Sequence, residues 1–174
     1  MAGSSRRDRA IWVGGGFAAA LLLDVATKWL ILNVVMVSPR TIEVTPFLNL
    51  TLGFNTGVSF GMFQDLFLDR PLVLAGIKVA ITIGLLVWAM RTHWIVEATA
   101  LGLIAGGAAG NIVDRVHQGV VTDFLDFHVG NWHWPAFNMA DVAISTGVAL
   151  LLAGSRFSSR SAPRAQEASS NGKR

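Results

Sequence analysis

The sequence contains no cysteine and few charged residues. Without cysteine the chain cannot form a disulfide, a thiolate zinc site or a cysteine nucleophile. Only 14% of its 174 residues are charged, compared with about 25% in an average soluble domain. The basic residues lie mostly near the two ends and form no stripe interleaved with aromatic side chains. We therefore expect no nucleic-acid partner.

Apolar residues, in contrast, are abundant. They make up 52% of the chain, and the mean hydropathy is +0.52. This composition is typical of a small integral membrane protein with one domain, which we place at 1–154. Four apolar stretches each approach the ~20 residues that a helix needs to cross a bilayer. We predict four transmembrane helices, at about 10–37, 71–90, 94–113 and 137–154.

The first stretch has an alternative interpretation. "RRDRAIWVGGGFAAALLL" combines a basic start with an apolar run, as a secretory signal peptide does. No clear small-x-small cleavage site precedes a soluble region, and three further apolar stretches follow. We therefore predict a transmembrane helix here.

Lysine and arginine placement predicts the orientation. Four spans put both termini on one side of the membrane, and basic residues are denser in the flanks on that side. Both termini are then cytoplasmic. We predict that the polar, basic segment 155–174 is a disordered cytoplasmic tail. Segments 38–70 and 115–136 fall outside; we expect short strands in both, and an interfacial helix near "FGMFQDLF".

Glycines recur every four residues in the third stretch, at Gly102, Gly106 and Gly110. They share one helix face, and small residues let helices approach closely in lipid. This face packs either within one bundle or in a dimer interface. We expect the first and a monomer.

Carboxylates inside apolar segments are costly, so each is a candidate functional group. Asp24 and Lys28 lie four residues apart on one helix face, in the order that favours pairing. They form either an internal ion pair or a substrate-positioning pair. Asp114 and Arg115 lie where the third stretch leaves the membrane. Lys78 lies inside the second stretch, and its partner is not evident from the pattern.

Three aspartates cluster near the outer start of the fourth stretch. Asp141 follows Asn138 by three residues, on the same helix face. Asp123 and Asp126 lie in a predicted strand and, being three apart, face opposite sides. One of them could form a proton-sharing pair with Asp141, as in water-activating aspartic proteases. Separate structural carboxylates are the alternative.

Other catalytic schemes have weaker support. There is no G-x-S-x-G nucleophile motif and no H-E-x-x-H zinc motif. Asp126, His128 and His133 are the candidate metal ligands, but interfacial histidines are the preferred interpretation. We expect no metal and no cofactor.

Five sequence blocks form one pattern, in this chain order: "DVATK" (24–28), "NTGVSF" (55–60), "GNIVDR" (110–115), "GVVTDFLDF" (119–127) and "FNMADVAI" (137–144). Together they resemble the lipoprotein signal peptidases, also called signal peptidase II. The resemblance covers about residues 10–155. Two details depart from the usual pattern: Val25 stands where the family more often has glutamine, and Thr122 stands where it more often has valine.

The resemblance implies a four-helix membrane aspartyl peptidase with a small extracytoplasmic β-cradle and an interfacial segment. It would remove the signal peptide from diacylglyceryl-modified prolipoproteins at the outer face of a bacterial inner membrane, cutting before the lipidated cysteine. Membrane lipid would surround it, and globomycin-type antibiotics would inhibit it. The catalytic pair would be Asp123 and Asp141. The supporting positions would be Asp24, Lys28, Asn55, Asn111, Asp114, Arg115, Asn138 and Ala140.

Two other classes of function are alternatives. A small proton-coupled transporter also keeps carboxylates in the membrane, but places them near the midplane. Asp123 and Asp141 are expected at one edge. A scaffold assembled through the glycine face would leave the outer carboxylates and asparagines unexplained. We therefore expect the peptidase.

Overall fold

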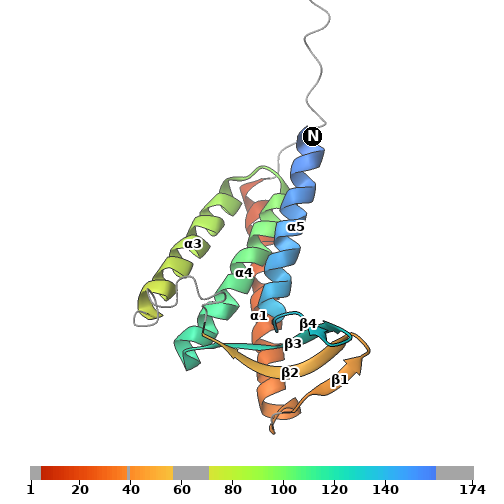
Figure 1. Ribbon diagram of the computed structural model, residues 1–174. Coiled ribbons are helices and arrows are strands. Elements are labelled where there is room, and N and C mark those ends of the chain that lie inside the picture. Colours follow the sequence, from red (N-terminus) through yellow and green to blue (C-terminus); the bar gives the residue numbers. More distant parts are fainter. Residues whose placement is uncertain (1–4, 39, 57–70, 160–174) are drawn as a thin grey trace, which may run out of the picture.

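The computed structural model describes residues 5–38, 40–56 and 71–159, in which four long helices run side by side with a small sheet at one end (Figure 1). In chain order the elements are α1 (Arg6–Leu30), the π-helical η1 (Ile31–Val35), β1 (Ile42–Thr45), β2 (Leu48–Asn55), α3 (Pro71–Arg91), α4 (Ile95–Gln118), β3 (Val121–Val129), β4 (Trp132–His133) and α5 (Met139–Ser159).

Helix α4 is the centre of the helical layer, because α1, α3 and α5 all pack against it. Its glycines permit this packing. A Cβ at Gly102 would meet the backbone of Val13 on α1, and one at Gly106 would meet Phe17. A Cβ at Gly107 would meet Ala140 of α5. The prediction that the glycine face packs within one bundle is confirmed.

The sheet is antiparallel, in the order β1-β2-β3-β4. The strand predicted in "GVVTDFLDFHV" is confirmed as β3. Phe137 forms an isolated bridge with Leu125, donating its N–H to the Leu125 carbonyl at 3.0 Å. A cluster of Ile31, Met36 and Phe124 packs η1, which continues α1, against the same strand. These contacts hold β3 against the ends of both α1 and α5.

The helix limits differ from the expected spans at several ends. Helix α1 begins at Arg6 with a reciprocal Ser5–Asp8 capping box, and α4 continues to Gln118, one turn past the expected end. Gly119 ends α4 in the left-handed conformation, at φ 80°. Helix α5 continues to Ser159, past the predicted tail boundary at 154. Polar composition marked that boundary, but a formed helix extends readily through serine and arginine.

Among the described residues, two helical segments are long and apolar enough to cross a membrane: Arg6–Val35 and Ile95–Gln118. Met139–Gly154 is a shorter apolar helix. Helix α1 also supplies buried polar groups to the site below, which argues against its interpretation as a removable signal peptide. The predicted interfacial helix near "FGMFQDLF" lies outside the described residues.

Candidate active site

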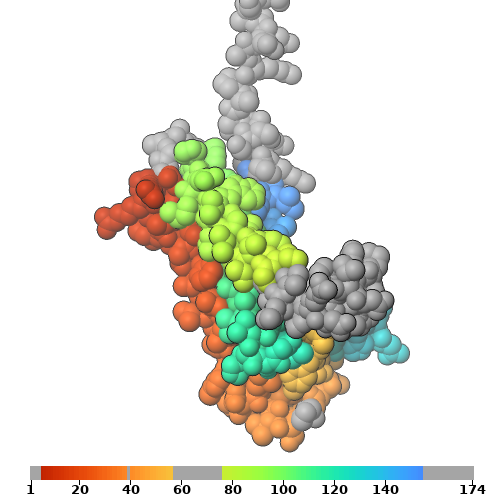
Figure 2. Space-filling model, turned by 90° about the vertical axis from the view of Figure 1, so that its left-hand side faces the viewer, coloured from red at the N-terminus to blue at the C-terminus, as the bar shows by residue number. Residues whose placement is uncertain are grey.

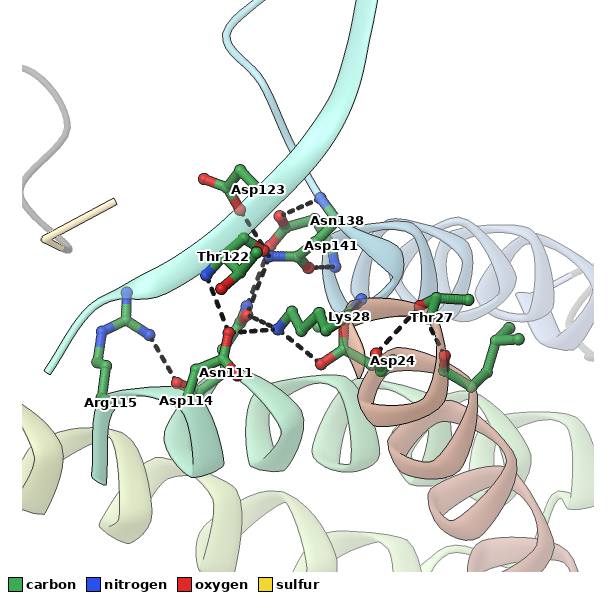
Figure 3. Close-up of polar contacts among 12 residues, drawn as sticks. Asp24, Thr27, Lys28, Asn111, Asp114, Arg115, Thr122, Asp123, Asn138 and Asp141 are labelled. Atoms are coloured by element: carbon green, nitrogen blue, oxygen red, sulfur yellow. Dashed lines mark hydrogen bonds and ion pairs between the residues drawn. The ribbon is translucent and has the colours of Figure 1, made fainter. Parts of the chain in front are cut away.

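Asp123 and Asp141 reach the same place from different elements (Figure 3). Asp123 lies on β3 and Asp141 lies in the first turn of α5. The fully buried Asn138 contacts both: its Nδ2 donates to Asp123 Oδ1 at 2.6 Å, and its backbone N–H donates to Asp141 Oδ2 at 3.2 Å. One residue therefore positions both carboxylates.

Asn138 can do this because it caps α5. Its Oδ1 accepts the backbone N–H of Asp141 at 3.1 Å, while the Asp141 carboxylate accepts the Asn138 N–H. This reciprocal pair is a capping box, and asparagine is among the favoured N-cap residues. These two hydrogen bonds stabilise the start of α5 within residues 137–141, and they also orient the Asp141 carboxylate.

Asp123 is 4% exposed, and this burial is the main cause that raises its pKa above the ordinary value. A hydrogen bond with Asn55 opposes the rise, and the nearby charge of Asp141 adds to it. The bond from Asn138 also lowers the pKa. The two carboxylates therefore interact electrostatically, and Asp123 keeps its proton to higher pH than a solvated aspartate does.

Lys28 is a buried cation with three polar partners. Its Nζ donates to Asp24 Oδ2 at 2.7 Å and to Asn111 Oδ1 at 3.2 Å, and it forms an ion pair with Asp114 Oδ2 at 3.0 Å. Two carboxylates therefore balance the charge of the buried ammonium group. The predicted Asp24–Lys28 ion pair is confirmed, and its amine reaches two further residues on α4.

Asp24 also connects α1 to α5. It is fully buried, and its Oδ1 accepts the backbone N–H of Ala140 at 2.8 Å. That N–H belongs to the first turn of α5, where backbone donors have no partner within the helix. Ala140 therefore joins the site through its backbone, and Asp24 fixes the turn that carries Asp141.

Asn111 links the lysine to the carboxylates. Its Oδ1 accepts from Lys28 and, at 3.2 Å, from Asn138, while its Nδ2 donates to Asp141 Oδ1 at 3.2 Å. The bond from Lys28 fixes which end of the amide is oxygen. The amide NH₂ group of Asn111 therefore points toward Asp141. Each carboxylate oxygen of Asp141 accepts one N–H donor, Oδ1 from Asn111 and Oδ2 from Asn138.

The second cation near the pair is Arg115. It donates to the backbone carbonyl of Asn111 at 3.1 Å, and it interacts electrostatically with Asp114, Asp123 and Asp141. Lys78, half-buried on α3, also interacts electrostatically with Arg115 and Asp141. Positive charge from two helices therefore faces Asp141.

Sequence reasoning missed the role of Thr122, which it noted only as a departure from the usual family pattern. Thr122 is fully buried; its N–H donates to Asp114 at 2.9 Å and its carbonyl accepts from Asn138 at 3.2 Å. Its hydroxyl accepts from Gln118 at 2.7 Å. Two of these bonds use the backbone of Thr122, which every residue type has, so the side chain gave little indication of this role. The only indication in the sequence was that Thr122 is next to Asp123.

Asp126 has partners outside this network. Asn49 donates to it at 3.1 Å, and His133 Nδ1 lies 2.8 Å from its Oδ1. Burial raises the pKa of Asp126, but the bonds from His133 and Asn49 outweigh it and hold the pKa below the ordinary value. The predicted separation of Asp123 from Asp126 is confirmed.

The candidate metal ligands do not converge on one point. The rings of His128 and His133 stack with centroids 5.1 Å apart, and His133 Nδ1 is directed at the Asp126 carboxylate. In the part of the chain that the structure describes, there is no group of three or more His, Cys, Asp or Glu side chains that could hold a metal ion.

A family model described as signal peptidase (SPase) II matches residues 17–157. The chain belongs to the signal peptidase II family. It is 42% identical over 151 residues to the lipoprotein signal peptidase of Methylocella silvestris, covering 85% of this chain and 88% of the relative. The lipoprotein signal peptidase of Methylorubrum extorquens is 44% identical over 149 residues, covering 84% and 85%.

Solved structures agree with the fold. Two structures described as bacterial membrane enzymes are each 28% identical to the chain, with TM-scores of 0.73 and 0.71. The first alignment covers 87% of this chain and 92% of the other, and the second covers 82% and 90%. The chain therefore has a membrane-enzyme fold of apolar helices with a small antiparallel sheet, and family membership makes it a peptidase.

Proposed function

We propose that this chain removes the signal peptide from diacylglyceryl-modified prolipoproteins by aspartyl catalysis with Asp123 and Asp141. The observation that carries the proposal is Asn138, which hydrogen-bonds both carboxylates at the start of α5. The names of the relatives support the substrate class. Cleavage would fall just before the lipidated cysteine, and the substrate itself supplies the cysteine that this chain lacks.

The surroundings of the two carboxylates differ, which supports different roles. Asp141 accepts N–H donors from Asn111 and Asn138 at the N-terminus of α5. Burial raises the pKa of Asp123, which favours its protonated form. We therefore assign Asp141 as the base that takes a proton from water.

In this scheme the water oxygen attacks the scissile carbonyl carbon as its proton moves to Asp141. Asp123 gives its proton to the carbonyl oxygen, which forms a gem-diol. As the C–N bond breaks, Asp141 gives the proton it took from water to the leaving amine of the cysteine, and Asp123 regains a proton from a hydroxyl of the diol as the new carboxyl group forms. Lys28, Asp24 and Asn111 hold the pair in place. The half-buried Asn55 contacts Asp123 from β2, where it could also meet an extended substrate.

The position of the site supports a membrane topology. Asp123 on β3 and Asp141 in the first turn of α5 belong to the end of the molecule where the sheet meets the helices (Figure 1). In the proposed topology, water and a membrane-embedded signal peptide would meet at this depth. We propose four spans within a domain of residues 1–154, with both termini in the cytoplasm and the site at the outer face of the bacterial inner membrane. Segment 155–174 would be largely a cytoplasmic tail, and the enzyme would act as a monomer inhibited by globomycin-type antibiotics.

A gel-shift assay tests the substrate class. Purified chain is incubated with one prolipoprotein in two forms, with and without diacylglycerol on the cysteine. We expect the lipidated form to be cut and the unlipidated form to stay intact. Equal cleavage of both forms would contradict the proposed substrate. Cleavage of the lipidated form in the presence of globomycin would contradict the proposed inhibition.

A further inference from the structure

A groove of about 510 Å³ opens between α1 and α3, at the end of the helices opposite the sheet. Helices α1 and α3 both pack on α4, and the groove lies between them. Figure 2 shows the N-terminal part of α1 (red) alongside the C-terminal half of α3 (green). The groove is lined by Arg6 of α1 and by Ile83, Leu86, Val87, Met90 and Arg91 of α3.

The lining changes from charged to apolar along the helix axis. Arg6 and Arg91 stand at one end, and the apolar wall continues back to Ile83. Eight residues of helix at ~1.5 Å each give a wall about 12 Å long. Ile83 is 56% exposed and Val87 is 44% exposed, so this wall presents its side chains outward.

Two tryptophans near the charged end indicate where this groove would lie in a membrane. Trp12 on α1 and Trp88 on α3 are both half-exposed close to that end. Indole rings prefer the headgroup region of a bilayer. Under the proposed topology the two arginines would therefore lie at headgroup depth, and the apolar wall would extend into the hydrocarbon.

We propose that this groove binds one anionic phospholipid, with its phosphate between Arg6 and Arg91 and an acyl chain along Ile83 and Val87. The charge pattern supports this occupant, because two guanidinium groups match a phosphate and an apolar wall matches an acyl chain. Among the described residues near this end, the acidic Asp8 and Glu97 accept hydrogen bonds from Ser5 and Thr92. The lipid belongs to the cytoplasmic leaflet under the proposed topology; the binding does not depend on the proposed function.

Native mass spectrometry of the full chain in neutral detergent tests the proposal. The probes are phosphatidylglycerol, phosphatidylcholine with the same acyl chains, and glycerol 3-phosphate without acyl chains. We expect bound phosphatidylglycerol at one copy, much weaker phosphatidylcholine, and no retained glycerol 3-phosphate. Equal binding of the two lipids would overturn the anionic specificity, and binding of glycerol 3-phosphate alone would overturn the role of the apolar wall.

Matched variants locate the site. Arg6→Gln and Arg91→Gln should each weaken phosphatidylglycerol binding about fivefold, and the double variant about 25-fold, if each arginine contributes as juxtamembrane basic residues usually do. Arg7→Gln is the control, because Arg7 is exposed on the same turn but does not line the groove. An equal loss with Arg7→Gln would show nonspecific attraction and refute the site.

A second pair of variants tests the wall independently of charge. Val87→Trp places a large side chain in the groove and should reduce phosphatidylglycerol binding. Ile81→Trp on the same helix is exposed and outside the groove, and should leave binding unchanged. Unchanged binding in the Val87 variant would contradict the proposed acyl-chain position. Melting temperatures measured without added lipid verify that each variant is folded.

Discussion

Replacing Asn138 with serine separates two roles of one side chain. Asn138 caps α5 through its Oδ1 and donates to Asp123 through its Nδ2 at 2.6 Å. Serine can still cap the helix, since it is as favoured as asparagine at this position, but its shorter hydroxyl cannot replace the amide donor to Asp123. Alanine loses both functions.

The two substitutions should therefore differ in stability but not in activity. Because only serine keeps a cap, Asn138→Ala should be about 1–2 kcal/mol less stable than Asn138→Ser. Both lose a hydrogen bond to a carboxyl group, worth about 1.5–3 kcal/mol. If that bond positions Asp123 for the reaction, kcat/KM should fall roughly 10- to 150-fold in both variants.

The pH profile of kcat/KM distinguishes a positioning role of Asn138 toward Asp123 from a general loss of folded structure. The bond from Asn138 lowers the pKa of Asp123, so its removal should raise that pKa further. Asp123 acts in its protonated form in our scheme, so the alkaline limb of kcat/KM should move to higher pH. The assay is cleavage of a diacylated precursor from pH 5 to 9 in both variants, with exposed Asn33→Ala as the control. Full activity of Asn138→Ser, or an alkaline limb that moves to lower pH, would refute the reasoning.

Three further substitutions test the supporting contacts. Lys28→Met leaves buried carboxylates without their cation and should lower stability by about 3–5 kcal/mol, measured as the melting temperature in detergent. Gly110→Ala places a Cβ against the Asp24 carboxylate, which cannot move away, and should destabilise by about 1–3 kcal/mol. Asp126→Asn weakens the pair with His133 and should cost about 1–2 kcal/mol near neutral pH, with cleavage largely retained.

Each of these three predictions has a control or a result that would contradict it. For Gly110→Ala the control is Gly84→Ala, which should be neutral or stabilising because Gly84 has open space where a Cβ would stand. An equal loss of stability at Gly84 would remove the steric argument for Gly110.

The pKa of Asp126 is lowered in the folded chain. The stabilising effect of its ionised carboxylate is therefore present above the unfolded pKa and is lost as pH falls through the folded pKa. The Asp126→Asn deficit should therefore shrink below about pH 4. A Lys28→Met variant as stable as the parent would contradict the buried cation.

Local patterns predicted much of the fold. Helical periodicity placed Asp24 and Lys28 on one face, and their ion pair forms within a single turn of α1. Four-residue spacing of glycine predicted one closely packed helix face, and the structure shows that its partner is α1. Strand alternation separated Asp123 from Asp126, because alternation follows from backbone geometry alone.

Contacts between distant segments were not predictable in the same way. The bond from the Ala140 N–H to Asp24 joins residues 116 positions apart, and no spacing rule relates them. The link from Lys28 through Asn111 to Asp141 depends on how α1, α4 and α5 pack. Thr122 contributes backbone groups, which any residue type has. Periodicity left the dyad and separate carboxylates open, and only the family resemblance ranked Asp123 with Asp141.

The most direct test of the central claim compares three aspartate-to-asparagine variants in one cleavage assay with diacylated precursor. Asp123→Asn and Asp141→Asn should keep melting temperatures near that of the parent and lose at least about 1,000-fold in kcat/KM, because each removes a proton-transfer group. Asp126→Asn, on the same strand as Asp123, should stay active. Turnover at the parent rate by folded Asp123→Asn or Asp141→Asn would contradict the assignment of these two carboxylates as the catalytic pair.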